Sequence, residues 1–156
     1  MSNWTVDILE PDSDVNVAVE KLGSVIGRLY QESWHTDKEP LYQKPFSLNA
    51  EVFARMWFSK ALKIFIAYDE KHEAVGYLLG LVFRPLPYEA SVFQVEDWFT
   101  RGNIELERQL FDHVTQAIRY IGCDEIWVSD HADRTPHVSS VWKQRGSFTF
   151  RRYLKE

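Results

Sequence analysis

The sequence predicts an α/β (α+β) fold in which a mixed, mostly antiparallel sheet is flanked by helices on both faces. The nearly continuous apolar run over 74–83 suits a strand that is covered on both faces. A well-marked amphipathic helix over 104–121 lies between strand-like segments at 91–100 and 125–129. A strand, a crossover helix and a second strand place their two strands parallel in one sheet. We therefore expect 91–100 and 125–129 to be parallel and to splay apart at one end.

Periodicity and capping residues predict the elements of the N-terminal half. The expected elements are a strand over 4–9, a helix over 14–30 capped by Asp12 or Ser13, a loop over 32–47, a helix after Asn49 that buries Val52, Phe53, Met56 and Trp57, a strand over 63–68 and a charged turn over 69–73. The apolar strand over 74–83 follows this turn.

Glycine and proline define the boundaries of the C-terminal elements. Gly122 is expected to end the long helix. Pro136 begins a short helix over 136–145, because its missing N–H costs nothing in the first turn, and a last strand over 147–154 follows. The predicted order is strand, two helices, three strands, helix, strand, helix and strand. We take residues 1–156 as a single domain.

Charge and composition exclude several classes of function. The 156 residues carry a net charge of −5, so no overall positive field attracts nucleic acid or an anionic membrane surface. Cys123 is the single cysteine, which excludes an internal disulfide, and we expect it to be a small buried residue. The N-terminal segment has no apolar run, and no segment approaches the roughly 18 apolar residues of a membrane span. We expect a cytoplasmic protein without nucleic-acid or membrane partners.

Side chains that could bind a metal lie close together in one segment, at Asp130, His131, Asp133 and His137. Their spacing matches no zinc motif, so we expect a solvated loop and no metal. His113 is expected on the exposed face of the long helix.

Four stretches resemble motifs of the GCN5-related N-acetyltransferase (GNAT) superfamily, in the same order over nearly the whole chain. They are the hairpin residues 66–68 (IAY) and 74–77 (AVGY), Arg101-Gly102 before the long helix, Gly122-Cys123 before a strand, and 142–147 (WKQRGS) with 153–155 (YLK). The chain is also similar to divergent GNAT-like proteins that bacteriophages encode, some of which are virion components. A phage virion is therefore the alternative location.

The resemblance implies an acetyl-CoA-dependent N-acetyltransferase whose acceptor is the amine of a small molecule or of a protein. In the family, backbone N–H groups at a helix N-terminus hold the pyrophosphate of coenzyme A. Carried over to this sequence, the cofactor-binding residues are Arg101, Gly102, Asn103, Ile104, Glu105 and Leu106.

The same resemblance implies two catalytic positions, Glu96 and Trp142. Glu96 lies on the strand beside the expected acetyl group, where a carboxylate can act as general base. The alternative for Glu96 is a solvated carboxylate at the edge of a strand, and alternation places Asp97 on the opposite face. Trp142 stands where the family has a tyrosine that protonates the leaving thiolate, and an indole N–H is no useful acid.

The cofactor loop departs from the pattern of the family. Ile104 and Leu106 stand where the family places small residues. The Ile104 side chain could turn inward, whereas Leu106 is harder to place beside a pyrophosphate. Glu105 and Glu107 add negative charge to the first turn of the helix, where they would repel phosphate.

These departures leave a second hypothesis open, from a different class of protein. The chain would then be a catalytically inactive GNAT-fold binding or structural module that uses the groove or an exposed sheet for a protein partner, and a homo-oligomer is a further alternative. Leu106, Trp142 and the aromatic strand over 92–99 would be packing or interface residues. The fold alone does not decide between the two hypotheses.

Overall fold

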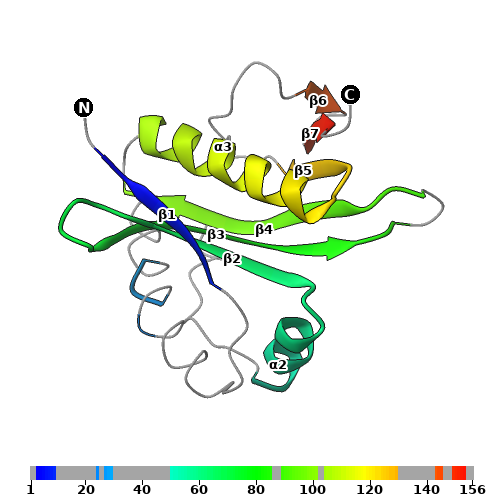
Figure 1. The fold of residues 1–156 in the computed structure, drawn as a ribbon, viewed down its shortest axis with the longest axis horizontal. Helices are drawn as coiled ribbons and strands as arrows, with labels where there is room; N and C mark the ends of the chain where they lie inside the picture. The colour runs from blue at the N-terminus through cyan, green and yellow to red at the C-terminus, as the bar shows by residue number, and fades with distance from the viewer. Residues whose placement is uncertain are drawn as a thin grey trace, which may run out of the picture.

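The computed structural model describes residues 3–9, 24, 27–29, 50–85, 89–101, 104–129, 143–145 and 149–153, and its strands form one seven-stranded sheet (Figure 1). The described elements are β1 (Thr5–Leu9), α2 (Ala50–Phe58), β2 (Leu62–Tyr68), β3 (Ala74–Phe83), β4 (Val92–Thr100), α3 (Ile104–Ile121), β5 (Glu125–Ser129), β6 (Lys143–Arg145) and β7 (Thr149–Tyr153). Ser24 and residues 27–29 are also helical, in agreement with the predicted helix over 14–30, whose other residues lie outside the described ones.

The sheet has the order β1-β2-β3-β4-β5-β7-β6. Strands β1 to β4 are paired antiparallel in sequence, β5 pairs antiparallel with β7, and β7 with β6. The pair β4–β5 is parallel, because α3 carries the chain back along the sheet between them. The predicted mixed, mostly antiparallel sheet and its parallel pair are therefore confirmed.

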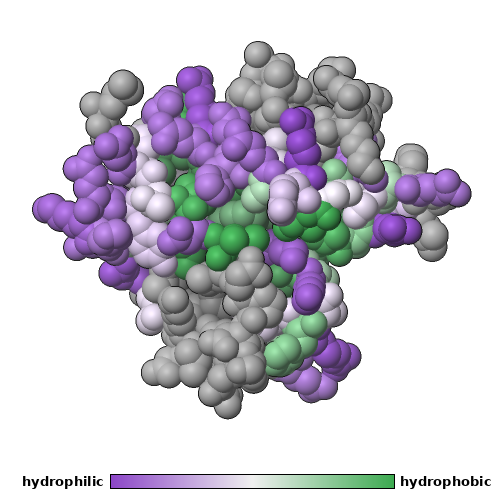
Figure 2. Space-filling view, viewed as in Figure 1, coloured by the Kyte–Doolittle hydropathy of each residue, from purple (hydrophilic) through white to green (hydrophobic). Residues whose placement is uncertain are grey.

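Helix α3 covers one face of the sheet (Figure 1). Its buried positions recur at helical spacing and pack on the sheet, and they include Leu106, Leu110, Phe111, Val114 and Ile118. Figure 2 shows hydrophilic residues over the outward side of this helix. His113 is exposed there, as predicted.

Gly122 ends α3, as predicted. Its φ of 104° lies in the left-handed region that favours glycine. The Gly122 N–H donates to the Arg119 carbonyl at 3.0 Å, and the Cys123 N–H donates to the Ile118 carbonyl at 3.2 Å. These two bonds satisfy carbonyls of the last turn, and the chain then enters β5.

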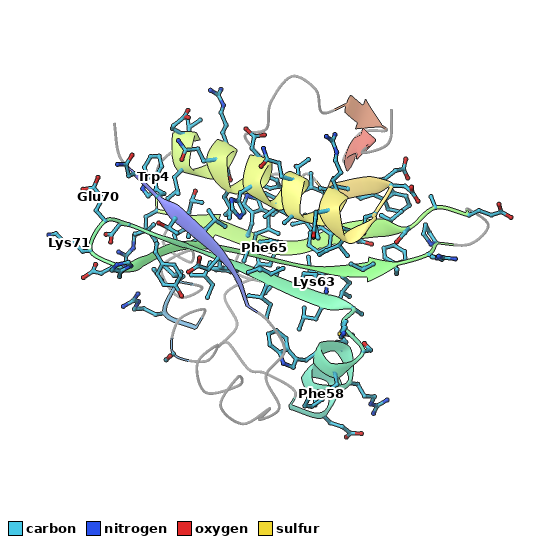
Figure 3. All side chains as sticks on the ribbon, viewed as in Figure 1. Trp4, Phe58, Lys63, Phe65, Glu70 and Lys71 are labelled. Carbon is cyan, nitrogen blue, oxygen red and sulfur yellow. The ribbon has the colours of Figure 1, made fainter. Side chains whose placement is uncertain are left out.

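The core has two parts, one on each face of the sheet. Phe65, Phe93 and Trp98 belong to the part under α3, and Figure 3 shows Phe65 between the sheet and that helix. Tyr77, Phe99 and Trp57 of α2 belong to the part on the opposite face. Helices thus cover both faces, as the sequence predicted. Among the described helices, none is long and apolar enough to cross a membrane.

One predicted element is wrong where the structure describes it. Residues 143–145 were expected at the end of a short helix, and they form strand β6, which pairs with β7. The cross-strand hydrogen bonds to β7 override the local preference, because helix propensity is a weak determinant for three residues. The remainder of that predicted helix, 136–142, and the predicted loop over 32–47 lie outside the described residues.

Candidate functional site

A β-bulge interrupts strand β4 at Glu96. Leu79 of β3 pairs with Asp97, and the next residue, Gly80, pairs with Val95, so that Glu96 is opposite no residue of β3. A bulge of this kind bends its strand and changes the direction of the side chains around it. Glu96 is exposed to solvent.

The pairing between β4 and β5 ends at the same point. It runs from Val92↔Glu125 to Val95↔Val128, while β4 continues to Thr100. Beyond Val95, β4 has no β5 partner among the described residues. The bulge and the end of this pairing therefore coincide, and the splay of the two strands stays a prediction, because β5 is described only as far as Ser129.

The bulge also separates the roles of the two adjacent carboxylates. Asp97 accepts a hydrogen bond from the Tyr77 hydroxyl at 2.5 Å through Oδ2, and one from the Trp98 backbone N–H at 2.9 Å through Oδ1. Tyr77 belongs to the core part on the α2 face, so Asp97 points toward that face. Asp97 is thus hydrogen-bonded within the protein, whereas Glu96 is exposed to solvent.

The expectation that Glu96 and Asp97 lie on opposite faces rested on strict alternation, which the bulge breaks. Val95 and Trp98 are three residues apart and both belong to the core part under α3. Regular alternation would place them on opposite faces. The sequence contained a signal of the bulge, because two acidic residues, Glu96 and Asp97, stand between the apolar residues Val95 and Trp98.

The first turn of α3 differs from expectation in the direction of its side chains. Ile104 is 52% exposed, so its side chain does not take the inward direction that the sequence left open. Leu106 is 2% exposed and packs in the core, so its side chain does not lie where a phosphate would bind the turn. Glu105 is exposed and accepts a bond from the Gln109 amide at 3.4 Å.

Arg101 connects the end of β4 to the segment before α3. Its backbone N–H donates to the Val75 carbonyl at 3.0 Å, so that N–H is already used within the sheet, while its side chain is exposed. Gly102 and Asn103, the next two predicted cofactor-binding residues, lie outside the described ones. So do Trp142 and the metal-capable residues Asp130, His131, Asp133 and His137. The described residues contain no group of three side chains that could hold a metal ion.

Sequence reasoning missed the contact that joins β4 to the first turn of α3. The Trp98 indole N–H donates to the Glu107 carboxylate at 2.6 Å, and Glu107 is only 8% exposed. Trp98 also makes an edge-to-face contact with Phe111, with ring centroids 5.8 Å apart. No local pattern predicts this pair, because one residue is on a strand and the other on a helix.

Several solved structures that are similar to this one are acetyltransferases. The acetyltransferase of GNAT family from Streptococcus pneumoniae is similar with a TM-score of 0.64 at 11% identity, over 97% of this chain and 99% of that chain. Two aminoglycoside acetyltransferases from uncultured soil metagenomic samples are similar over 83% of this chain. One has a TM-score of 0.62 at 16% identity over 81% of its length, and the other, solved with sisomicin, has 0.60 at 18% over 78%.

These likenesses establish the fold, which is that of the GNAT acetyltransferases. No protein-family model matches the sequence, and no curated protein matches it. The residues of the site, and not sequence similarity, must therefore carry the argument for function.

Proposed function

We propose that this chain is an acetyl-CoA-dependent N-acetyltransferase that transfers an acetyl group to an amine. One observation carries the proposal: the bulge in β4 coincides with the end of the β4–β5 pairing, and Glu96 is exposed at that position. A strand that loses its neighbour leaves backbone edge and space for an extended ligand, and a carboxylate beside that edge can accept a proton.

The residues present fit a thioester at this position. Bound acetyl-CoA would supply the acetyl group. A main-chain N–H of β4 beyond Val95 would donate to the acetyl carbonyl and polarise it for attack. Glu96 would accept the proton of the attacking amine, directly or through one water. Because Trp142 stands in the position of the family's tyrosine and supplies no acid, water would protonate the departing sulfur.

The other end of the cofactor would lie at the N-terminus of α3, near the amides of residues 102 to 106. N–H groups of a first helical turn point along the axis, and the helix dipole favours an anion there. With its side chain in the core, Leu106 would contribute its backbone alone. The net charge of −5 favours a cationic amine as acceptor, because a negative protein field attracts cations.

The charge of the same turn favours the second candidate, a non-catalytic module with a protein partner. Glu105 and Glu107 both place carboxylates in the first turn of α3, and they oppose a pyrophosphate there. In that case Leu106 and Phe111 would act in packing alone, and Glu96 would be a solvated carboxylate.

Calorimetric titration with acetyl-CoA and with CoA separates the two candidates. The enzyme predicts saturable binding of both, and loss of binding in Gly102→Trp, because a bulky side chain would fill the approach to the turn. Release of free thiol from acetyl-CoA is then measured with a panel of amines. Thiol release no faster than the spontaneous rate, together with no CoA binding, would exclude the enzyme.

Trp142→Tyr tests the proposed role of water at the sulfur. The phenolic O–H can donate a proton where indole cannot, so thiol release should be preserved or raised. In a non-catalytic module this substitution produces no activity.

A further inference from the structure

The hydrogen bond between Tyr77 and Asp97 lies beside Glu96, and the proposed chemistry does not use it. Tyr77 on β3 is fully buried, and its hydroxyl donates to Oδ2 of Asp97 at 2.5 Å. Tyr77 pairs with Phe99 on β4, so Asp97 is its diagonal neighbour on the same face of the sheet, within reach of a long aromatic side chain. The bond therefore joins β3 to the residue that directly follows Glu96.

The pairing of the strands leaves open which of the two acidic residues is the bulged one. Val95 and Trp98 are both buried in the core part under α3, which fixes β4 on either side of the acidic pair. Between the partners of these two residues β3 has the single residue Leu79, whereas β4 has Glu96 and Asp97. Either acidic residue can pair with Leu79 while Val95 and Trp98 stay in the core. A side-chain interaction is therefore needed to decide between them.

Two hydrogen bonds keep Asp97 in the paired position. The Tyr77 hydroxyl donates to one oxygen of the carboxylate, and the Trp98 backbone N–H donates to the other at 2.9 Å. Both donors belong to buried residues, and hydrogen bonds to a charged acceptor are among the strong ones. With Asp97 opposite Leu79, Glu96 is the residue that is opposite none of β3, and it is exposed to solvent.

We propose that Tyr77 is a positioning residue whose hydroxyl holds Asp97 in the paired position and thereby keeps Glu96 as the exposed carboxylate of the bulge. The inference rests on the proposed function, in which Glu96 accepts the proton of the attacking amine. Without the hydroxyl, the bulge exchanges between the two acidic residues, and Glu96 is paired with Leu79 for part of the time. A general base acts only within hydrogen-bond reach of its proton, so turnover falls.

Tyr77→Phe removes the donor and keeps the ring in the core. Because a misplacement of about 1 Å can cost about 100-fold in rate, we expect thiol release from acetyl-CoA to fall about 10- to 100-fold. The KM for acetyl-CoA should stay nearly the same, since the ring and the β3 backbone are kept. Tyr68→Phe is the matched control, because Tyr68 on β2 is partly buried against the same part of the core, and it should release thiol at the wild-type rate.

The same substitution in a Glu96→Gln background separates positioning from a general structural effect. If Tyr77 acts through Glu96, there is no general base left to position, and Tyr77→Phe should change the residual thiol release by no more than about 2-fold. A loss of packing or of folded protein would instead lower the rate by the same factor in both backgrounds.

Two substitutions of Asp97 complete the test. Asp97→Asn keeps both contacts, because the amide oxygen accepts from the Trp98 N–H and the amide nitrogen donates to the Tyr77 hydroxyl oxygen. Its thiol release should stay near that of the wild type. Asp97→Ala removes both contacts and should be as slow as Tyr77→Phe, and it takes the place of that variant if Tyr77→Phe does not fold.

The outcomes separate the inference from the proposed function. Slow release in Tyr77→Phe and Asp97→Ala, with near-normal release in Asp97→Asn and no further loss in the Glu96→Gln background, supports the inference. Wild-type release in folded Tyr77→Phe, or equal losses in both backgrounds, overturns it and leaves the enzyme standing. So does an Asp97→Asn variant as slow as Glu96→Gln, because the Asp97 carboxylate would then take the proton itself. A wild type that releases no thiol above the spontaneous rate overturns both.

Discussion

The parts of strand β4 before and after the bulge have different surroundings. From Val92 to Val95 the strand pairs with β3 and with β5, and Val92, Phe93 and Val95 are buried. From Asp97 to Thr100 it pairs with β3 and has no β5 partner among the described residues, and Glu96 between the two halves is the bulged residue. Both halves contribute to the core, since Trp98 and Phe99 are also buried, and the second half differs in carrying the exposed carboxylate of Glu96.

This difference assigns stability and function to separate residues of one strand. Substitutions before the bulge should change the free energy of unfolding and leave ligand binding intact in the protein that remains folded. Substitution of the exposed Glu96 should instead lower activity and leave the free energy of unfolding nearly unchanged. Two glycines of β3, Gly80 opposite Val95 and Gly76 opposite Thr100, test whether the two parts of β4 contribute differently to stability.

Glu96→Gln should produce the largest effect on activity. Removal of a general base lowers turnover by roughly 10²- to 10⁴-fold at neutral pH. Because Glu96 is exposed, the free energy of unfolding should change by no more than about 0.5 kcal/mol. Thiol release from acetyl-CoA and urea unfolding measure the two quantities, with the exposed Glu89→Gln as the control. Equal turnover in the two variants would remove Glu96 from catalysis.

Phe93→Ala should produce the largest effect on stability. Phe93 is fully buried and packs edge-to-face on Phe65 with ring centroids 6.3 Å apart. Its truncation should lower the free energy of unfolding by about 3–5 kcal/mol. Tyr120→Ala, at a side chain 94% exposed, should change it by no more than about 0.5 kcal/mol. A loss of CoA affinity in folded Phe93→Ala would show that the two halves are coupled.

The space around two glycines of β3 allows the packing against the two parts of β4 to be compared. A Cβ at Gly80, opposite Val95, would overlap the Gln94 carbonyl oxygen and come within 2.5 Å of the Phe93 ring. Gly80→Ala should therefore cost about 1–3 kcal/mol of stability through overpacking. A Cβ at Gly76, opposite Thr100, meets its nearest atoms at 3.0 Å, so Gly76→Ala should cost less. Thermal unfolding of both variants ranks them, and the reverse order would contradict the close packing of the first half.

The smallest expected effect is a pH dependence of stability that comes from Cys123, which lies just before the start of the β4–β5 pairing. Burial raises the pKa of the Cys123 thiol, the nearby Asp124 raises it further, and the Ser91 hydroxyl and Lys63 lower it. A raised pKa means that the folded state holds the proton more tightly, so this contribution to stability is present below the ordinary thiol pKa and is lost as pH rises above about 9.

Urea unfolding of wild type and Cys123→Ala from neutral to alkaline pH measures this contribution. The difference in free energy of unfolding between the two proteins should be constant near neutral pH and should shift against the wild type above about pH 9. Parallel curves over the whole range would mean that the thiol has its ordinary pKa.

The sequence predicts the elements with strong local periodicity. The bounds predicted for β3, α3 and β5 agree with the structure, because apolar runs and helical spacing are local properties. Strand β6 was not predicted, since its three polar residues have no periodicity and owe their conformation to pairing with β7. Tertiary contacts decide such segments.

The candidate site could be predicted in part. The position of Glu96 on a strand before a crossover helix follows from element order, and the bulge could have been inferred from two apolar residues three apart, Val95 and Trp98. The Trp98–Glu107 bond could not, because it requires the distance between a strand and the first turn of the next helix. Glu107 is buried because the Trp98 indole lies within hydrogen-bond distance of it, and the sequence alone does not give this distance.

The proposed function requires that the end of the β4–β5 pairing and the first turn of α3 form one acyl-CoA site. Amide chemical shifts of isotope-labelled protein during a titration with CoA test it most directly. A single site there should produce shifts for the amides of Glu96 to Trp98 and of Ile104 to Leu106, and none of similar size for Val92 to Val95. Shifts confined to α2 or to the β1–β2 pair, or no shifts at saturating CoA, would contradict it.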